Sequence, residues 1–172
     1  MKRSCRHPRW LALTVVAAGI LLDQLTKLLT ASLMELGETI PLIRDVLHIT
    51  YIQNRGAAFG MLKDHRWVFL VVSTVTILAI GAYLFVTRSR DPLYITSLAM
   101  ILSGGVGNMI DRLALGYVVD FIDFRLINFA VFNGADSFVC VGAALLFVSI
   151  LFEEKKKDPA RGTEEKTDDT PS

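Results

Sequence analysis

Cysteine and histidine are scarce in this sequence, and their scarcity removes several kinds of site. The two cysteines, Cys5 and Cys140, stand in a basic tail and in a long apolar run, so we expect neither a disulfide nor a metal site from them. The three histidines are scattered, and no H-E-x-x-H pattern pairs two of them as in a zinc protease. No G-x-S-x-G sequence with a partner histidine points to serine chemistry. We therefore expect no metal ion and no cofactor.

Charge is also scarce, and apolar residues dominate. Only 20% of the residues are charged, and the basic ones gather mainly at the two ends rather than along a groove with interleaved aromatic residues, so nucleic-acid binding is not expected. Hydrophobic residues make up 52% of the chain, and the mean hydropathy is positive. This composition is typical of an integral membrane protein and not of a soluble domain of this size.

Four apolar runs are long enough to cross a membrane as helices, namely residues 10–34, 67–86, 93–113 and 134–152. About 20 residues at 1.5 Å per residue span a hydrocarbon core of roughly 30 Å. The basic start of the chain and the run that ends at Leu22 also fit a secretory signal peptide. The apolar pattern resumes beyond Asp23 and Gln24, which favours a membrane helix. Asp91 and Pro92 suit the cap and the first position of the third helix.

Two stretches between these helices are more polar. Residues of about 38–62 include Val46–Gln53, whose rough alternation predicts a short strand or two outside the bilayer. The segment before the fourth helix is rich in phenylalanine, which favours a place at the membrane interface and would make Asp123 a solvated charge. The predicted fold is therefore an all-α integral membrane protein with four transmembrane helices, a small β element and an interfacial segment.

The distribution of basic residues predicts the orientation. Eleven lysines and arginines fall in the two tails and in the loop between the second and third helices, against six in the opposite loops and the adjoining end of the third helix. Cytoplasmic loops carry the excess of basic residues, so we expect both termini in the cytoplasm and the β element on the periplasmic side. We expect residues 1–157 to form a single membrane domain and residues 158–172, which are polar and charged, to form a disordered cytoplasmic tail.

Polar residues gather between Gly104 and Ser137, in a part of the chain that is otherwise apolar. An ionised group in a membrane is costly unless it has a partner or a task. Asp120 and Asp136 could form an acid–base pair, because two carboxylates that are forced together share one proton. The full set is Asn108, Asp111, Arg112, Asp120, Asn133 and Asp136.

Intramembrane carboxylates also mark proton and ion pathways, so a small ion- or proton-coupled transporter is the alternative function, and a structural membrane subunit is a third. Repeated discontinuous helices would favour transport, and the sequence shows none. The residues alone leave protease and transporter nearly equal.

Two further features are candidates for supporting this site. Asp23 and Lys27 are four residues apart on the first helix, where an ion pair satisfies both charges, either as a structural pair or as part of a site. Asp111 and Arg112 are adjacent, about 100° apart around a helix, so each is expected to meet an ionic partner elsewhere.

Four sequence blocks together resemble the signature of bacterial lipoprotein signal peptidase, also called signal peptidase II. The blocks are NRGAAF at Asn54–Phe59, GNMIDR at Gly107–Arg112, VVDF at Val118–Phe121 and FNGADS at Phe132–Ser137. The resemblance implies an aspartyl endopeptidase of the bacterial inner membrane, which removes signal peptides from diacylglyceryl-modified prolipoproteins before the lipidated cysteine. It places the catalytic aspartates at Asp120 and Asp136, on the periplasmic side.

The resemblance also extends to supporting residues and to partners. The residues expected to bind substrate or to support the aspartates are Asp23, Lys27, Asn54, Gly56, Asn108, Asp111, Arg112 and Asn133. The expected partners are diacylated prolipoproteins and membrane lipid, with the enzyme acting as a monomer. Gly134 departs from the family, which usually has a branched apolar residue there, and this would loosen the start of the fourth helix.

Overall fold

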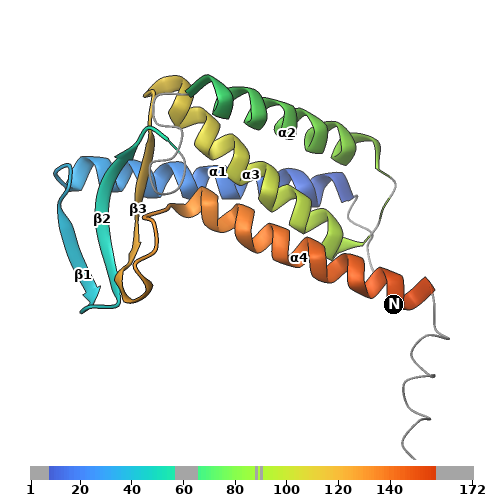
Figure 1. The fold of residues 1–172 in the computed structure, drawn as a ribbon. Helices are drawn as coiled ribbons and strands as arrows, with labels where there is room; N and C mark the ends of the chain where they lie inside the picture. Colours follow the sequence, from blue (N-terminus) through green and yellow to red (C-terminus); the bar gives the residue numbers. More distant parts are fainter. Residues whose placement is uncertain (1–7, 57–65, 88, 90, 158–172) are drawn as a thin grey trace, which may run out of the picture.

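Four long helices lie side by side, and a small sheet stands across one end of them (Figure 1). The structure is a computed structural model that describes residues 8–56, 66–87, 89 and 91–157. The helices are α1 (Pro8–Leu33), α2 (Arg66–Val86), α3 (Pro92–Ala114) and α4 (Gly134–Lys157). The strands are β1 (Thr39–Ile43), β2 (Leu47–Asn54) and β3 (Val118–Phe124), and a short 3-10 helix, η2 (Arg125–Ile127), follows β3.

All four helices are long and apolar enough to cross a membrane, over Arg9–Leu33, Trp67–Val86, Pro92–Ala114 and Gly134–Phe152. This confirms the four helices expected from the sequence. The first helix runs unbroken for 26 residues through Asp23, which agrees with a membrane helix and not with a signal peptide that ends at Leu22. The expected start of α3 is also confirmed, since Asp91 accepts a 3.0 Å hydrogen bond from the Leu93 N–H and Pro92 begins the helix.

Helix α3 packs against α1, α2 and α4, and small residues allow these contacts. A Cβ atom at Gly104 would collide with the carbonyl oxygen of Ala135 on α4. A Cβ atom at Gly107 would collide with the Asp23 carboxylate on α1. Small residues at helix contacts let backbones approach closely in lipid, so these two glycines bring α1 and α4 to the same part of α3.

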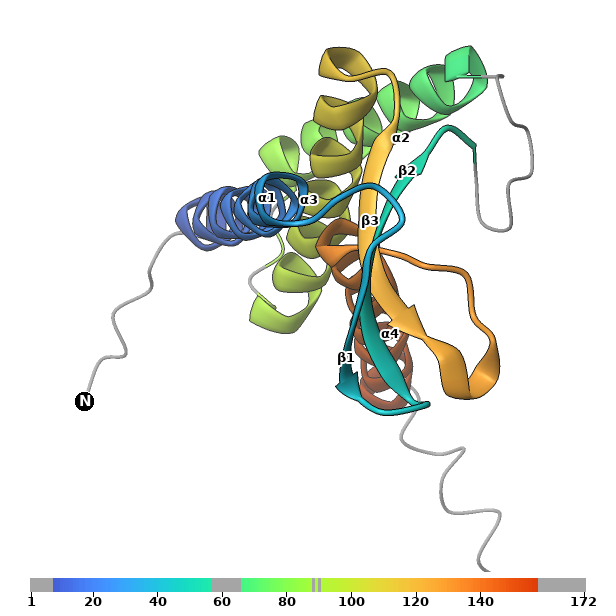
Figure 2. The same cartoon turned by 90° about the vertical axis from the view of Figure 1, so that its left-hand side faces the viewer.

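The sheet has three antiparallel strands in the order β1-β2-β3. The residues predicted to lie along the interface form β3, which pairs with β2, so the sheet draws on two parts of the chain that are far apart in sequence. Figure 2 shows the sheet from its own side, with β3 passing over the ends of the helices. The end of the predicted β element and the last part of the NRGAAF block fall in residues 57–65, which lie outside the described residues.

A bulge in β2 changes which of its side chains face the helices. Ile49 pairs with Ile122, whereas Ile52 pairs with Asp120, so Thr50 and Tyr51 stand opposite the single residue Phe121. One extra residue in a strand turns all later side chains to the other face. Because of the bulge, Ile52 and Asn54 share a face with Asp120, and Gln53 lies on the other face.

The two ends of the bundle differ. The sheet lies at one end, and α1 begins and α4 ends at the other (Figure 1). The predicted tail, residues 158–172, lies outside the described part of the chain.

Candidate active site

Asp120 and Asp136 reach one site from two different elements. Asp120 lies on β3, and Asp136 is the third residue of α4. Between them the chain turns away and returns at Phe132, which forms a β-bridge with Ile122 through hydrogen bonds of 2.8 and 3.1 Å. The bridge places Asn133 directly beside the strand that carries Asp120. Helix α4 therefore starts next to that aspartate.

Asn133 caps α4 and contacts both aspartates. Its side-chain oxygen accepts a 3.0 Å hydrogen bond from the Asp136 N–H, and its own N–H donates to Asp136 Oδ2 at 3.2 Å. This reciprocal pair is a capping box, which stabilises a helix N-terminus. The amide group of Asn133 also donates to Asp120 Oδ1 at 2.6 Å. One fully buried side chain thus fixes the two carboxylates relative to each other. Gly134, which was expected to loosen the start of this helix, is the first residue of α4, and both cap hydrogen bonds form there.

Two further asparagines complete the hydrogen bonding of the carboxylates. Asn54 donates to Asp120 Oδ2 at 2.9 Å, and Asn108 donates to Asp136 Oδ1 at 2.7 Å. All four carboxylate oxygens therefore accept a hydrogen bond from an N–H group. Gly56 donates its backbone N–H to Asn54 Oδ1 at 2.9 Å, which turns the amide nitrogen of Asn54 toward Asp120.

Burial affects the acidity of Asp120, which is only 2% exposed. Loss of solvation raises the pKa of the Asp120 carboxyl to about 6, and the charge of Asp136 acts in the same direction. The hydrogen bonds from Asn54 and Asn133 lower this pKa, because they favour the charged form. A carboxyl with such a pKa can hold or release a proton near neutral pH.

A buried ion cluster lies beneath the two aspartates. Lys27 contacts Asp23 at 2.9 Å and Asp111 at 3.0 Å, and it donates to Asn108 Oδ1 at 2.9 Å. The three charged side chains are at most 4% exposed. The predicted pairing of Asp23 with Lys27 is therefore correct, and Lys27 is the ionic partner that was expected for Asp111. All three protons of the ammonium group have a partner.

The two acidic members of this cluster hold the backbone next to each aspartate of the pair. Asp23 accepts the N–H of Ala135 at 2.8 Å, and Asp111 accepts the N–H of Val119 at 3.1 Å. These two residues directly precede Asp136 and Asp120 in the chain. The ion cluster thus ties α1 and α3 to both halves of the site.

Gln24 belongs to this cluster although the sequence did not single it out. Its amide nitrogen lies 3.0 Å from Asp111 Oδ1, 3.2 Å from Asp23 Oδ2 and 3.2 Å from the Gly107 carbonyl oxygen. The only sequence feature that could have pointed to Gln24 is that a neutral polar residue lies within a predicted membrane helix. Polar side chains inside such a helix need partners, and Gln24 finds three.

The contacts of Arg112 differ from the ion pair expected from the sequence. Within the described residues it forms no ion pair, and its guanidinium lies over the Phe69 ring, 5.0 Å from the ring centre. One of its nitrogens donates to the Asn108 carbonyl oxygen at 3.3 Å. A cation over an aromatic face is stabilised without an anion, which leaves the positive charge of Arg112 beside the site.

The prediction for Asp123 was wrong. Its side chain is buried, accepting 2.7 Å and 3.1 Å hydrogen bonds from Thr50 and Arg125. The cause is the third strand, since pairing with β2 turns Asp123 toward Thr50, on the face opposite to Asp120. Thr39 on β1 also contacts Thr50 and Arg125, so Asp123 is part of a network that links all three strands.

Comparison with known proteins identifies the family. Residues 15–152 match the family described as Signal peptidase (SPase) II. The lipoprotein signal peptidase of Halothermothrix orenii is 47% identical over 144 residues, which cover 84% of this chain and 97% of that protein. The lipoprotein signal peptidase of Brevibacillus brevis is 44% identical over 142 residues, covering 83% and 95%. This chain belongs to the lipoprotein signal peptidase family.

The fold agrees with solved structures. One described as a bacterial membrane enzyme at 2.3 Å resolution superposes with a TM-score of 0.77 at 27% identity, covering 94% of each chain. A second such structure, at 1.9 Å resolution, has a TM-score of 0.74 and 29% identity and covers 81% of this chain and 92% of the other.

Membership of the lipoprotein signal peptidase family establishes the activity. The protein is an aspartic peptidase that cleaves signal peptides from prolipoproteins, and it crosses a bacterial membrane several times. This decides against the transporter alternative.

Proposed function

We propose that Asp120 and Asp136 are the catalytic pair of this signal peptidase. The observation that carries the proposal is the position of Asn133, which hydrogen-bonds to both carboxylates and holds them beside each other. The donors on all four oxygens leave the pair oriented before substrate arrives. Such preorganisation is a main source of catalysis in enzymes.

In this proposal Asp120 holds the shared proton and Asp136 is the base. The capping box and the positive end of α4 favour a charged Asp136, which leaves the shared proton on Asp120. Asp136 takes a proton from a water molecule, whose oxygen attacks the scissile carbonyl carbon while Asp120 donates its proton to the carbonyl oxygen. The tetrahedral species then collapses as Asp136 passes its proton to the leaving amine and Asp120 takes back the hydroxyl proton. No covalent intermediate forms.

The eight other residues singled out from the sequence support this pair in different ways. Asn54, Asn108 and Asn133 orient the carboxylates, and Gly56 orients Asn54. Asp23, Lys27 and Asp111 hold the backbone around them. Arg112 supplies a positive charge that can meet the substrate backbone. All ten residues come from one chain, which supports the proposal that the enzyme acts as a monomer.

We further propose that the substrate is the diacylglyceryl-modified precursor and that cleavage occurs before the lipidated cysteine. The membrane-crossing helices reach the site, so a lipid attached to the substrate can lie against them while the peptide bond is held at the pair. The test compares purified enzyme on lipidated and non-lipidated precursor peptides of one sequence. Equal turnover of the two peptides would contradict this part of the proposal.

For the orientation, we propose that the protein lies in the bacterial inner (cytoplasmic) membrane, that the sheet and the site face the periplasm, and that both termini lie in the cytoplasm. The supporting observations are the excess of basic residues in the tails and the start of α1 and end of α4 away from the sheet (Figure 1). Reporter fusions near Arg44 should report the outer side and fusions after Phe152 the cytoplasm. A cytoplasmic reporter at Arg44 would contradict the orientation.

A further inference from the structure

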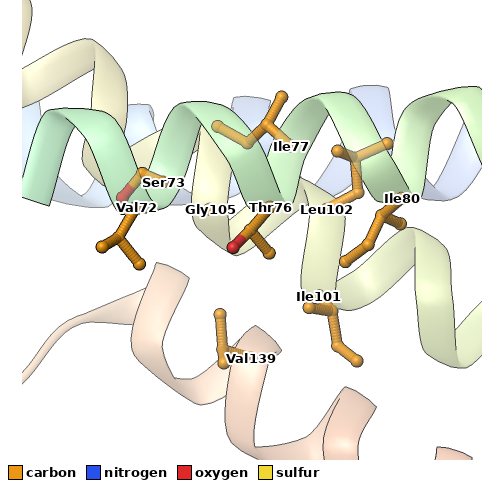
Figure 3. Close-up of a pocket in the computed structure, with 9 residues that line it drawn as sticks. All are labelled: Val72, Ser73, Thr76, Ile77, Ile80, Ile101, Leu102, Gly105 and Val139. Atoms are coloured by element: carbon orange, nitrogen blue, oxygen red, sulfur yellow. The ribbon is translucent and has the colours of Figure 1, made fainter.

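A cavity of about 130 Å³ lies between α2, α3 and α4, and most of its lining is apolar (Figure 3). Ile77 on α2 and Ile101 on α3 contribute branched side chains, and Gly105 leaves room at the wall of α3. In Figure 3 Val139 points from α4 toward Thr76 on α2. Val72 and Thr76 are exposed, so the cavity is partly open, and an apolar site of about this size can accept small hydrocarbon groups.

The cavity lies close to the catalytic pair along α3 and α4. Val139 follows Asp136 by three residues on α4, and Gly105 precedes Asn108 by three residues on α3. Asn108 itself donates to Asp136. The cavity therefore begins about one helical turn, or roughly 5 Å, from the pair, on the side away from the sheet.

Two hydroxyl groups interrupt the apolar lining. Ser73 and Thr76 are three residues apart on α2, so they share one side of the helix. Within the described residues neither hydroxyl has a hydrogen-bond partner. Thr74 on the same helix shows the usual alternative, since its hydroxyl donates to the Leu70 carbonyl oxygen at 2.6 Å. In an apolar environment the free donors of Ser73 and Thr76 favour a ligand that brings an acceptor.

We propose that this cavity binds the start of one acyl chain of the substrate's lipid, and that Ser73 and Thr76 donate hydrogen bonds to its ester carbonyl oxygen. An ester-linked chain has the required parts in the required order, an acceptor followed by methylene groups. In a diacylglyceryl cysteine the ester lies a few bonds beyond the side-chain sulfur, which matches a cavity one turn from the scissile bond. This inference rests on the proposed function, because it needs the lipidated cysteine at the catalytic pair.

The test uses purified full-length enzyme in detergent and two precursor peptides that differ in one linkage. One carries a diacylglyceryl cysteine, and the other carries the corresponding dialkyl ether, which has the same chains without carbonyl oxygens. The Ser73→Ala/Thr76→Val variant removes both hydroxyls and keeps the shape of the helix. Loss of these hydrogen bonds should lower kcat/KM about tenfold on the ester substrate and leave kcat/KM on the ether substrate unchanged.

Thr74→Val is the matched control, since Thr74 lies on the same helix and already has a partner; it should change neither value. An equal loss on the ester and ether substrates, or no loss on the ester, would overturn the inference. If the Ser73→Ala/Thr76→Val variant has a lower Tm than wild type in phospholipid bicelles but an unchanged kcat/KM, the cavity binds a membrane phospholipid. That result would also overturn the inference. Asp120→Asn, assayed on the ester peptide, tests the catalytic pair separately. If Asp120→Asn is inactive while the hydroxyl variant behaves as wild type, the pair stands and the lipid site falls.

Discussion

Asn54 can donate its 2.9 Å hydrogen bond to Asp120 because β2 has one residue more than β3 at its bulge. Without that extra residue, Asn54 would lie on the face of the sheet that holds Asp123. Bulges often lie next to active sites, where they redirect a side chain. The register of β2 is thus part of the proposed catalytic arrangement, and it connects the acidity of Asp120 to the geometry of the sheet.

The activity should depend on pH through the proton on Asp120. The proposed mechanism needs a proton on Asp120, so kcat/KM should fall as pH rises through the pKa of the free enzyme, about 6. Asn54→Ala removes a hydrogen bond that favours the charged carboxylate, so the pKa should rise and the alkaline limb should move to higher pH. The rate at the optimum should fall about tenfold or more, since hydrogen bonds to charged groups are worth about 1.5–3 kcal/mol. The measurement is a kcat/KM profile against pH for both enzymes. A limb that moved to lower pH in Asn54→Ala would contradict the account.

The same pKa predicts a pH dependence of stability. The pKa of Asp120 is higher in the folded protein, about 6, than its ordinary value of 3.8. The folded state therefore binds this proton more tightly, and the stabilising contribution is complete below the ordinary pKa and is lost as pH rises through about 6. Asp120→Asn cannot lose a proton, so its Tm relative to wild type should increase between pH 4 and pH 7. Thermal unfolding in detergent across this range checks it; a constant difference in Tm would count against a raised pKa.

Asp123 should matter for folding and not for chemistry. Asp123→Ala leaves Thr50 and Arg125 without their acceptor in the sheet, which should cost about 1–3 kcal/mol of stability. The rate per folded enzyme should stay close to that of wild type, because Asp123 lies on the face opposite to Asp120. Arg44→Ala is the control: its ion pair with Asp45 is 3.7 Å long and solvent-exposed, and such pairs contribute little. If Asp123→Ala were as stable as Arg44→Ala, the hydrogen-bond network across the strands would not stabilise the fold.

Lys27 should be required for folding because it is the ionic partner of two buried carboxylates. Lys27→Met leaves Asp23 and Asp111 charged and unpaired, which typically costs about 3–5 kcal/mol. Adding Asp111→Asn to Lys27→Met removes one of these charges and should restore part of the lost stability. The measurement is the unfolding free energy of the two single variants and the double variant. Additive losses would show that the three charges do not act as one cluster.

The sequence pointed to the helices and to the proposed catalytic pair for the same physical reason. Long apolar runs can be recognised locally, and Asp120 and Asp136 are conspicuous because a charge in an apolar setting needs an explanation. The third strand could not be found this way. Asp120 and Asp123 are three residues apart, which breaks the alternation typical of a half-buried strand, and the pairing partner lies more than 60 residues away in β2.

The remaining features depend on that distant pairing. The bulge, the position of Asn54 and the burial of Asp123 all follow from the register between β2 and β3, which local patterns do not contain. The contacts of Gln24 likewise need α1 and α3 side by side before its three partners can be named. The ion pair of Asp23 and Lys27 was predictable because both residues lie on one helix, four positions apart.

The most direct test of the account is the rate of Asp120→Asn, Asp136→Asn and the double variant, each per folded enzyme on a diacylated precursor peptide. The two carboxylates share one proton and act on one water molecule, so either single change should abolish turnover about as fully as both together. Folding is checked separately by Tm. The account predicts three equally inactive enzymes. A single variant that kept more than about a tenth of the wild-type rate would contradict it, since acid–base groups typically supply 100-fold or more.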